Sequence, residues 1–206
     1  MLHWETVSTE LKDLILFVSQ RPVFNDFSLG GGTALALQLG HRISVDADFI
    51  SAIKFDRETM LKHAREELDN VTDLHLGEMG VFLKSNGIKV DFLSWGLPFI
   101  RPIQNLEGVR ILSIEDIVAM KLFAITRRGE KKDYYDLAIL LDWFSLKELF
   151  DFYHERHKGD DTSLLLRFLV SFSDIDKQPE PHRLYEMDWP SARERLVKAT
   201  KLFLQQ

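Results

Sequence analysis

Apolar positions recur at helical spacing near the start of the chain and then alternate with polar ones. A helix is predicted over residues 5–20, with one apolar face formed by Leu11, Leu14, Ile15 and Val18. The pattern then favours short strands over 27–29 and 45–51, separated by a helix over 33–39 that Gly40 ends. A charged helix is predicted over 57–68, with Asp56 as its cap.

The strongest local signal in the first half is Asn86–Gly87, which separates two alternating apolar segments, 80–85 and 88–94. An Asn-Gly pair between such segments is typical of a tight β-hairpin. A further short strand is predicted over 74–76. The first half of the chain is therefore expected to form a small mixed sheet with helices.

The pattern changes after Arg110, and the rest of the chain is predicted to be helical. Ser113 with Asp116 marks a capped helix start, and Gly129 marks its end. Further helices are predicted over 130–143, from Ser145 with Glu148 in a capping box, over 162–172, and from Pro190. We expect an α+β fold, with a mixed α/β core over 1–110 and a helical subdomain, a C-terminal bundle, over 111–206.

Composition narrows the possible chemistry. The 206 residues carry a formal net charge of −6 and include no cysteine. Thiol nucleophiles, disulfides and cysteine-based zinc sites are excluded, and binding to nucleic acid requires a local basic patch. The N-terminus lacks the features of a signal peptide, and no apolar run approaches the roughly 18 residues that a membrane span needs. We expect a cytoplasmic protein with no membrane partner.

Three aspartates lie in predicted strands. Asp46 and Asp48 are two residues apart, so a strand would point both side chains to one face, and Asp91 lies between Val90 and Phe92. Carboxylates this close repel unless a cation or a proton lies between them. Three of them at one sheet edge would suit Mg²⁺. The alternative is a solvated sheet face without function.

Three consecutive glycines, Gly30–Gly32, lie between a predicted strand and a helix that begins at Thr33. Such a turn lets the backbone approach a phosphate, and the helix N-terminus adds free N–H groups. Thr33 would cap the helix or contact the phosphate. Arg42 and Ser44 precede the aspartate pair and would contact a triphosphate, or Arg42 would pair with an acid. The alternative for the glycines is a tight turn alone.

Lys121 lies on an apolar helix face, since its neighbours one turn away are Ile117, Val118, Ala124 and Ile125. A lysine there either extends its ammonium to water or binds an anion. The next predicted helix carries Asp133 and Asp136 on one face. The turn between the two helices is basic, which indicates an RNA-binding patch or a solvated junction formed by Arg127, Arg128, Lys131 and Lys132. His41 is interpreted as a turn residue.

Together these motifs resemble a known family. The segment GGTALALQLGHRISVDADF is similar to the signature of nucleotidyltransferases of the DNA polymerase beta-like superfamily, and more narrowly to the AbiEii/AbiGii toxins of type IV toxin–antitoxin systems. Ala47 departs from the bulkier residue usual there. The helical lysine, the Arg-Gly turn and the D-x-x-D-L segment of that family match Lys121, Arg128–Gly129 and Asp133 to Leu137. The resemblance covers roughly residues 28–140.

The resemblance implies a nucleotidyltransferase fold and an Mg²⁺-dependent transfer of a nucleoside monophosphate from an NTP. It implies that Asp46, Asp48 and Asp91 hold two metal ions and that Gly31, Gly32 and Thr33 cradle the phosphates. Lys121 would bind phosphate, Asp136 would be catalytic, and Asp133 would have a weaker role. It further implies an RNA acceptor such as a tRNA 3′ end, a cognate antitoxin and a role in phage defence.

Two other functions remain open at the level of sequence. One is a nucleotidyltransferase that modifies a protein or a small molecule such as an antibiotic. The other is a nucleotide-binding module that acts on a partner without turnover. The intact set of three aspartates argues against the second, because binding alone needs fewer carboxylates.

Overall fold

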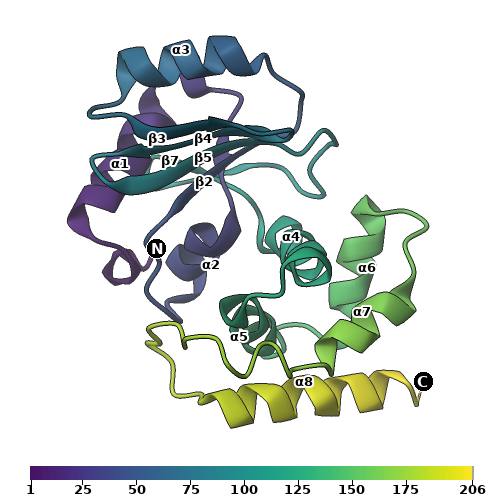
Figure 1. The fold of residues 1–206 in the computed structure, drawn as a ribbon. Helices are drawn as coiled ribbons and strands as arrows, with labels where there is room; N and C mark the ends of the chain where they lie inside the picture. Colours follow the sequence, from purple (N-terminus) through teal and green to yellow (C-terminus); the bar gives the residue numbers. More distant parts are fainter. Residues whose placement is uncertain (206) are drawn as a thin grey trace. The chain divides into compact units, whose positions relative to one another are not determined.

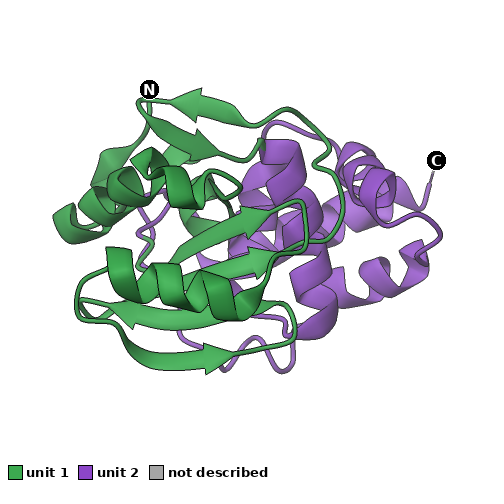
Figure 2. Ribbon diagram, turned by 90° about the horizontal axis from the view of Figure 1, so that it is seen from above, with its two compact units in different colours: residues 1–40, 44–113 green, residues 41–43, 114–206 purple. Residues whose placement is uncertain are grey.

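The computed structural model describes residues 1–205 and divides the chain into two compact units (Figure 2). Unit 1 comprises residues 1–40 and 44–113, and unit 2 comprises residues 41–43 and the chain from 114 onward. The chain therefore enters unit 2 for three residues, returns to unit 1, and enters unit 2 again after Ser113.

Unit 1 is built around a mixed sheet (Figure 1). Its helices are the 3-10 turns η1 (Trp4–Thr6) and η2 (Pro22–Phe24) and the α-helices α1 (Thr9–Gln20), α2 (Gly31–Leu39) and α3 (Arg57–Glu67). Its strands are β1 (Ser28–Leu29), β2 (Ala47–Ser51), β3 (Thr72–Leu76), β4 (Gly80–Ser85), β5 (Ile88–Ser94), β6 (Gln104–Leu106) and β7 (Val109–Ile111).

Among the described residues the sheet has seven strands, in the order β3-β4-β5-β2-β1-β7-β6. Strand β2 runs parallel to β5 and antiparallel to β1, so β2 lies in the middle of the sheet. Within unit 1, α3 covers one face of the sheet and α2 lies against the other (Figure 1). Phe49 of β2 and Phe92 of β5 stack at 5.4 Å and pack with Phe24 and Phe27 in the core.

The hairpin predicted at Asn86–Gly87 is confirmed. Strands β4 and β5 pair antiparallel from Ser85 opposite Ile88 to Gly80 opposite Leu93. Both turn residues have positive φ angles, 50° at Asn86 and 80° at Gly87, as a tight turn that matches the strand twist requires. This turn fixes the register of β5, which carries Asp91.

Several predicted boundaries differ from the observed ones. The first helix begins at Thr9 after Ser8, whose hydroxyl accepts a hydrogen bond from the Leu11 N–H. The helix after the glycines begins at Gly31 rather than Thr33. The strand predicted over 45–51 begins at Ala47, and Val45 ahead of it is 69% exposed.

One hairpin was missed by the sequence patterns. Strands β6 and β7 have three residues each and are joined by Glu107–Gly108, with φ angles of 53° and 85°. The turn has the same left-handed backbone as Asn86–Gly87, but the strands are too short to show alternation. Strand β7 then pairs parallel to β1 through Leu29 and Ile111.

Unit 2 is helical, as predicted. Its helices are α4 (Ile114–Arg127), α5 (Lys131–Leu140), α6 (Leu146–Arg156), α7 (Thr162–Leu169) and α8 (Trp189–Phe203). The capping box at Ser145 and Glu148 is confirmed. Helix α4 packs against α5, α6 and α7, and α8 packs against the same three helices. The helices predicted over 130–143 and 162–172 end earlier, at Leu140 and Leu169.

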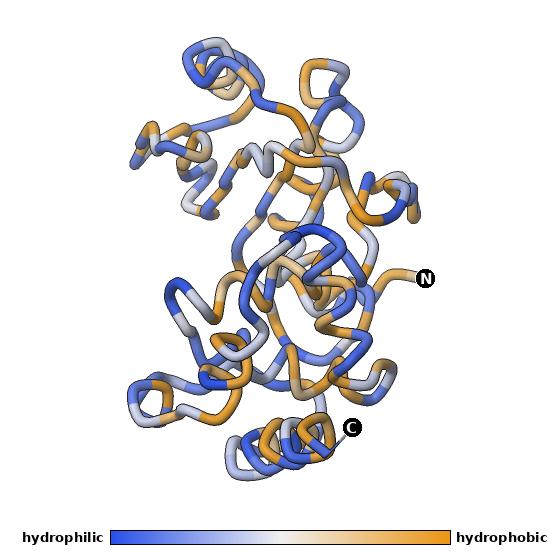
Figure 3. The backbone as a smooth tube through the Cα atoms, turned by 90° about the vertical axis from the view of Figure 1, so that its right-hand side faces the viewer, coloured by the Kyte–Doolittle hydropathy of each residue, from blue (hydrophilic) through white to orange (hydrophobic). Residues whose placement is uncertain are grey.

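Aromatic side chains hold α5 and α8 together. Trp189 contacts Tyr134 and Phe172 edge to face, at ring distances of 6.2 and 5.7 Å. Figure 3 shows apolar and polar residues alternating around the turns of α8, the pattern of a helix with one buried face. Among the described residues, no helix is long and apolar enough to cross a membrane.

Candidate functional site

Two aspartates of unit 1 lie side by side on neighbouring strands. Strands β2 and β5 are parallel and in register, with Asp48 opposite Asp91 and Phe49 opposite Phe92. Because successive side chains of a strand point to opposite faces, the phenylalanines fill the core and both carboxylates lie on the other face. Asp91 is buried, with 5% of its surface exposed, whereas Asp48 is half-buried.

A lysine that the sequence patterns did not single out neutralises part of this charge. Lys89 lies two residues before Asp91 in β5, and its Nζ donates to Asp91 Oδ2 at 2.6 Å. Burial alone would lower the pKa of Lys89, but the hydrogen bond to Asp91 and the negative charges of Asp48 and Asp46 hold that pKa above its ordinary value. All three predicted aspartates therefore lie within electrostatic reach of one ammonium group.

The glycine turn lies directly against Asp48. Gly31 has a φ of +63°, and a Cβ built on it would overlap the Oδ2 atom of Asp48. The Gly30 N–H donates to the main-chain carbonyl of Asp48 at 2.8 Å, and Gly30 supplies no side-chain cap to α2. The N-terminus of α2, with its free N–H groups, thus begins beside a strand carboxylate.

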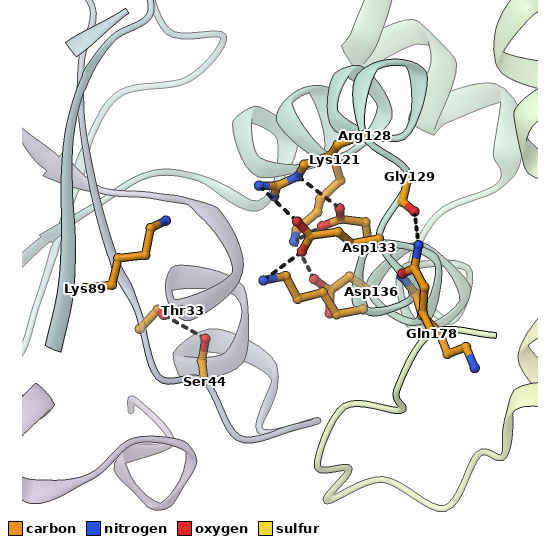
Figure 4. Close-up of polar contacts among 12 residues, drawn as sticks. Thr33, Ser44, Lys89, Lys121, Arg128, Gly129, Asp133, Asp136 and Gln178 are labelled. Carbon is orange, nitrogen blue, oxygen red and sulfur yellow. Dashed lines mark hydrogen bonds and ion pairs between the residues drawn. The ribbon is translucent and has the colours of Figure 1, made fainter. Parts of the chain in front are cut away.

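Thr33 and Ser44 hold the segment that carries Asp46. The Thr33 hydroxyl donates to the main-chain carbonyl of Asp46 and lies 2.8 Å from the Ser44 hydroxyl (Figure 4). Both side chains are buried. The structure therefore places these hydroxyl groups on an internal contact and gives Thr33 no capping role. Asp46 itself lies just ahead of β2 rather than within it.

The donor atoms suit a hard divalent cation. The three carboxylates offer only oxygen ligands, which Mg²⁺ prefers. Within residues 1–205, however, no group of three acidic, histidine or cysteine side chains has the arrangement of a preformed metal site. The residues fit Mg²⁺ in chemistry, and two of them, Asp48 and Asp91, lie opposite each other in the sheet.

In unit 2, Lys121 lies within a buried charge cluster (Figure 4). Its Nζ is 2.7 Å from Asp133 Oδ1 and 2.6 Å from Asp136 Oδ2, and the lysine side chain is only 4% exposed. Lys121 therefore does not extend to water, and the anions it binds belong to its own unit. Burial lowers the pKa of Lys121, but Asp133 and Asp136 more than offset this effect and raise it.

Asp136 is fully buried and is held by three side chains. Arg42 donates to both carboxylate oxygens, at 2.7 and 3.0 Å, and His41 Nε2 lies 2.8 Å from Oδ1. Burial would raise the pKa of Asp136, but the charges of Arg42 and Lys121 hold it well below its ordinary range. Of the two alternatives for Arg42, the structure shows the acid pair. His41 is a buried partner of this carboxylate, a role that its position in the sequence did not indicate.

The basic residues near Gly129 are only partly at the surface. Lys131 is buried, donates to the main-chain carbonyl of Asp176 at 3.0 Å, and lies 5.2 Å from the Trp189 ring. Arg127 and Arg128 are exposed and Lys132 is half-buried. Arg128 and Lys132 both pair with Glu130, at 3.5 and 2.9 Å. The exposed part of the predicted basic patch is therefore small and partly neutralised.

The chain is similar to several known proteins. At 32% identity over 189 residues, the chain is similar to the uncharacterized protein aq_aa25 of Aquifex aeolicus (strain VF5), covering 89% of this chain and 90% of that protein. The fold resembles JHP933 from Helicobacter pylori, with 19% identity, a TM-score of 0.53, and coverage of 97% of this chain and 94% of that one.

It also resembles MenT4, a nucleotidyltransferase toxin from Mycobacterium tuberculosis H37Rv, with 16% identity, a TM-score of 0.58, and coverage of 96% of this chain and 82% of that one. At these identities the likeness concerns the fold. The family profile described as "Nucleotidyl transferase AbiEii toxin, Type IV TA system" matches residues 14–204. The glycine turn, the paired strand aspartates and a match over almost the whole chain therefore make this protein a member of the AbiEii family of nucleotidyltransferase toxins.

Proposed function

We propose that this nucleotidyltransferase depends on Mg²⁺ and transfers a nucleoside monophosphate from an NTP to an RNA acceptor, the 3′ end of a tRNA. The family assigns nucleotidyl transfer and a toxin role, and a type IV system implies an antitoxin partner. The observation that carries the proposal is the in-register pair Asp48–Asp91, of which Asp48 lies against Gly31 at the start of α2.

Each part of this arrangement has a role in the proposed reaction. The N–H groups at the start of α2, from Gly31 and Gly32, bind the outer phosphates of the NTP. Asp48 and Asp91, with Asp46, hold Mg²⁺, which when bound supplies positive charge to the phosphates. The buried contacts of Thr33 and Ser44 hold the main chain of Asp46 just ahead of β2.

The reaction follows from phosphoryl-transfer chemistry. The acceptor oxygen forms a bond to the α-phosphorus while the bond from that phosphorus to the bridging oxygen breaks. The electron pair of the broken bond leaves with pyrophosphate, and the acceptor hydroxyl gives its proton to a carboxylate of the aspartate cluster. Positioning and charge neutralisation supply most of the rate in such reactions.

The resemblance also implies phosphate binding by Lys121 and catalysis by Asp136. Both side chains are buried in the charge cluster of unit 2, so these roles require Lys121 to leave Asp133 and Asp136. We propose that in the observed conformation the cluster is a structural element. Arg127, Arg128 and Lys132 are proposed contacts for the RNA backbone, because they are the accessible members of the basic turn.

An assay with each labelled NTP, Mg²⁺ and total tRNA tests the proposal. We expect label on RNA, and we expect Asp48→Asn to lower the transfer rate by at least about a hundredfold, because the carboxylate charge is lost at the reacting phosphates. Addition of EDTA should stop the reaction. Asp73→Asn is the matched control, since Asp73 is an exposed strand aspartate that pairs with Lys84.

Other outcomes point to specific alternatives. Label on a protein or a small molecule would keep the transfer chemistry and replace the RNA acceptor. Undiminished transfer by Asp48→Asn, with Asp73→Asn unchanged, would remove the aspartate cluster from the reaction.

A further inference from the structure

Lys89 shares a sheet face with Asp91 and Asp48. In the parallel pairing of β2 with β5, Ala47 lies opposite Val90 and Asp48 opposite Asp91. Since alternate residues of a strand share a face, Lys89 and Asp91 of β5 lie on the same face as Asp48 of β2. Asp46 lies just ahead of β2.

The contacts of Lys89 differ from those of its neighbour on the next strand. Lys84 of β4 is the register partner of Lys89, yet Lys84 Nζ binds Asp73 Oδ2 at 2.7 Å. Lys89 Nζ instead binds the buried carboxylate of Asp91 at 2.6 Å.

We propose that Lys89 is a built-in counter-ion of the aspartate cluster, which holds Asp91 in the absence of a divalent cation and yields that carboxylate when a cation binds. This inference rests on the proposed metal role of the three aspartates. If so, Lys89 stabilises the metal-free protein and weakens metal binding in the absence of nucleotide.

The charged groups near Lys89 come from three strands. Asp91 lies on its own strand β5, Asp48 lies on β2, and Lys84 of β4 is its register partner, while Asp46 lies just ahead of β2.

Titration of the full chain with Mn²⁺, followed by electron paramagnetic resonance of the free ion, tests this inference without nucleotide and without turnover. Lys89→Met should bind Mn²⁺ about fivefold more tightly than the unmodified protein, the factor expected for loss of a half-exposed competing ion pair. Lys89→Arg keeps the charge and should bind nearly as the unmodified protein does.

Lys84→Met is a closely matched control. Lys84 and Lys89 are both 46% exposed, each forms one short ion pair with an aspartate, and each substitution removes one positive charge. Lys84→Met should leave Mn²⁺ affinity unchanged. In the absence of metal, Lys89→Met should lower the Tm more than Lys84→Met, because the crowded carboxylates then repel each other. Lys89→Gln serves as a second neutral variant if Lys89→Met does not fold.

The outcomes separate this inference from the proposed function. Equal Mn²⁺ affinity in the unmodified protein and Lys89→Met, lost in Asp48→Asn, would overturn the counter-ion and keep the metal site. Weaker binding by Lys89→Met than by Lys84→Met would also overturn it, because the lysine would then assist the cation. No Mn²⁺ binding by any folded variant would overturn both proposals.

Discussion

At the scale of single residues, Gly31 joins the two halves of the signature segment. Its φ of +63° lies in the left-handed region that side chains rarely adopt, and its missing Cβ leaves room for the Asp48 carboxylate. The absence of a side chain at Gly31 therefore permits both the left-handed turn and the close approach of Asp48. The repeated glycines and the paired aspartates are thus parts of one packing arrangement.

Replacing this glycine should damage the reaction as well as the fold. Gly31→Ala is expected to lower the free energy of unfolding by about 1–3 kcal/mol, because the new methyl group meets both backbone strain and the Asp48 side chain. Displacement of the carboxylate should reduce nucleotidyl transfer by about tenfold or more, since misplaced catalytic groups are costly. Chemical denaturation and the labelled-NTP assay measure the two effects.

Gly87 provides the control for this change. It has a φ of +80°, but a Cβ there meets nothing within 4 Å. Gly87→Ala should therefore cost stability through the backbone alone and leave transfer close to that of the unmodified protein. Equal loss of transfer in both variants would mean that general destabilisation, rather than the Asp48 contact, explains the effect of Gly31→Ala.

At the scale of elements, helices α4 and α5 are held together by buried ion pairs as well as by apolar contacts. Lys121 of α4 binds both aspartates of α5. Lys121→Met should lower the free energy of unfolding by about 3–5 kcal/mol, because buried Asp133 loses its short ion pair and buried Asp136 keeps only Arg42 as a cation. Lys147→Met is the control, since Lys147 forms an exposed pair with Asp151 and should cost less than about 1 kcal/mol.

Kinetics of the same variants distinguish the two roles considered for Lys121. A stability unchanged by Lys121→Met, together with a raised KM for the NTP, would contradict the structural role and favour phosphate binding. A large loss of stability with an unchanged KM in the remaining folded protein would place the lysine in the framework.

Elements with strong local signals were predictable from the sequence, and those without them were not. Asn86–Gly87 specifies its own backbone, so the β4–β5 hairpin followed from two residues. The β6–β7 hairpin uses Glu107–Gly108 and three-residue strands, in which neither composition nor alternation stands out.

The candidate site shows the same limit. Asp48, Asp91 and the glycine turn were identifiable from spacing and resemblance, because strand periodicity and turn chemistry are local. The contact of Lys89 with Asp91 was also within reach, since the two residues are two positions apart in one strand. The pairing of Arg42 and His41 with Asp136 spans more than 90 positions, and only tertiary structure reveals it.

At the scale of the whole molecule, the chain visits unit 2 before completing unit 1. Residues 41–43 belong to unit 2, where Ile43 N–H donates to the His182 carbonyl at 2.8 Å and Leu184 N–H donates to the His41 carbonyl at 2.9 Å. The helical unit therefore takes an edge segment and a buried cation from a distant part of the sequence.

This connectivity predicts that residues 114–206 expressed alone will be poorly stable. The fragment keeps Asp133, Asp136 and Lys121 but loses Arg42, so Lys121 is left to balance two buried carboxylates, at a cost of about 3–5 kcal/mol. Thermal unfolding followed by circular dichroism should show a weak or absent cooperative transition. Arg42→Met in the full chain should reproduce much of this loss. A fragment as stable as the intact chain would show that residues 111–206 are an autonomous domain.

The in-register pairing of β2 with β5 also determines where insertions and deletions can be tolerated. One inserted or deleted codon within either strand, ahead of its aspartate, would turn that carboxylate toward the phenylalanine core and a core side chain toward the outer face. Codons added between β5 and β6, at residues 95–103, leave both faces intact. Insertions and deletions are therefore expected in the loops of the sheet, where they leave both aspartates on the same face.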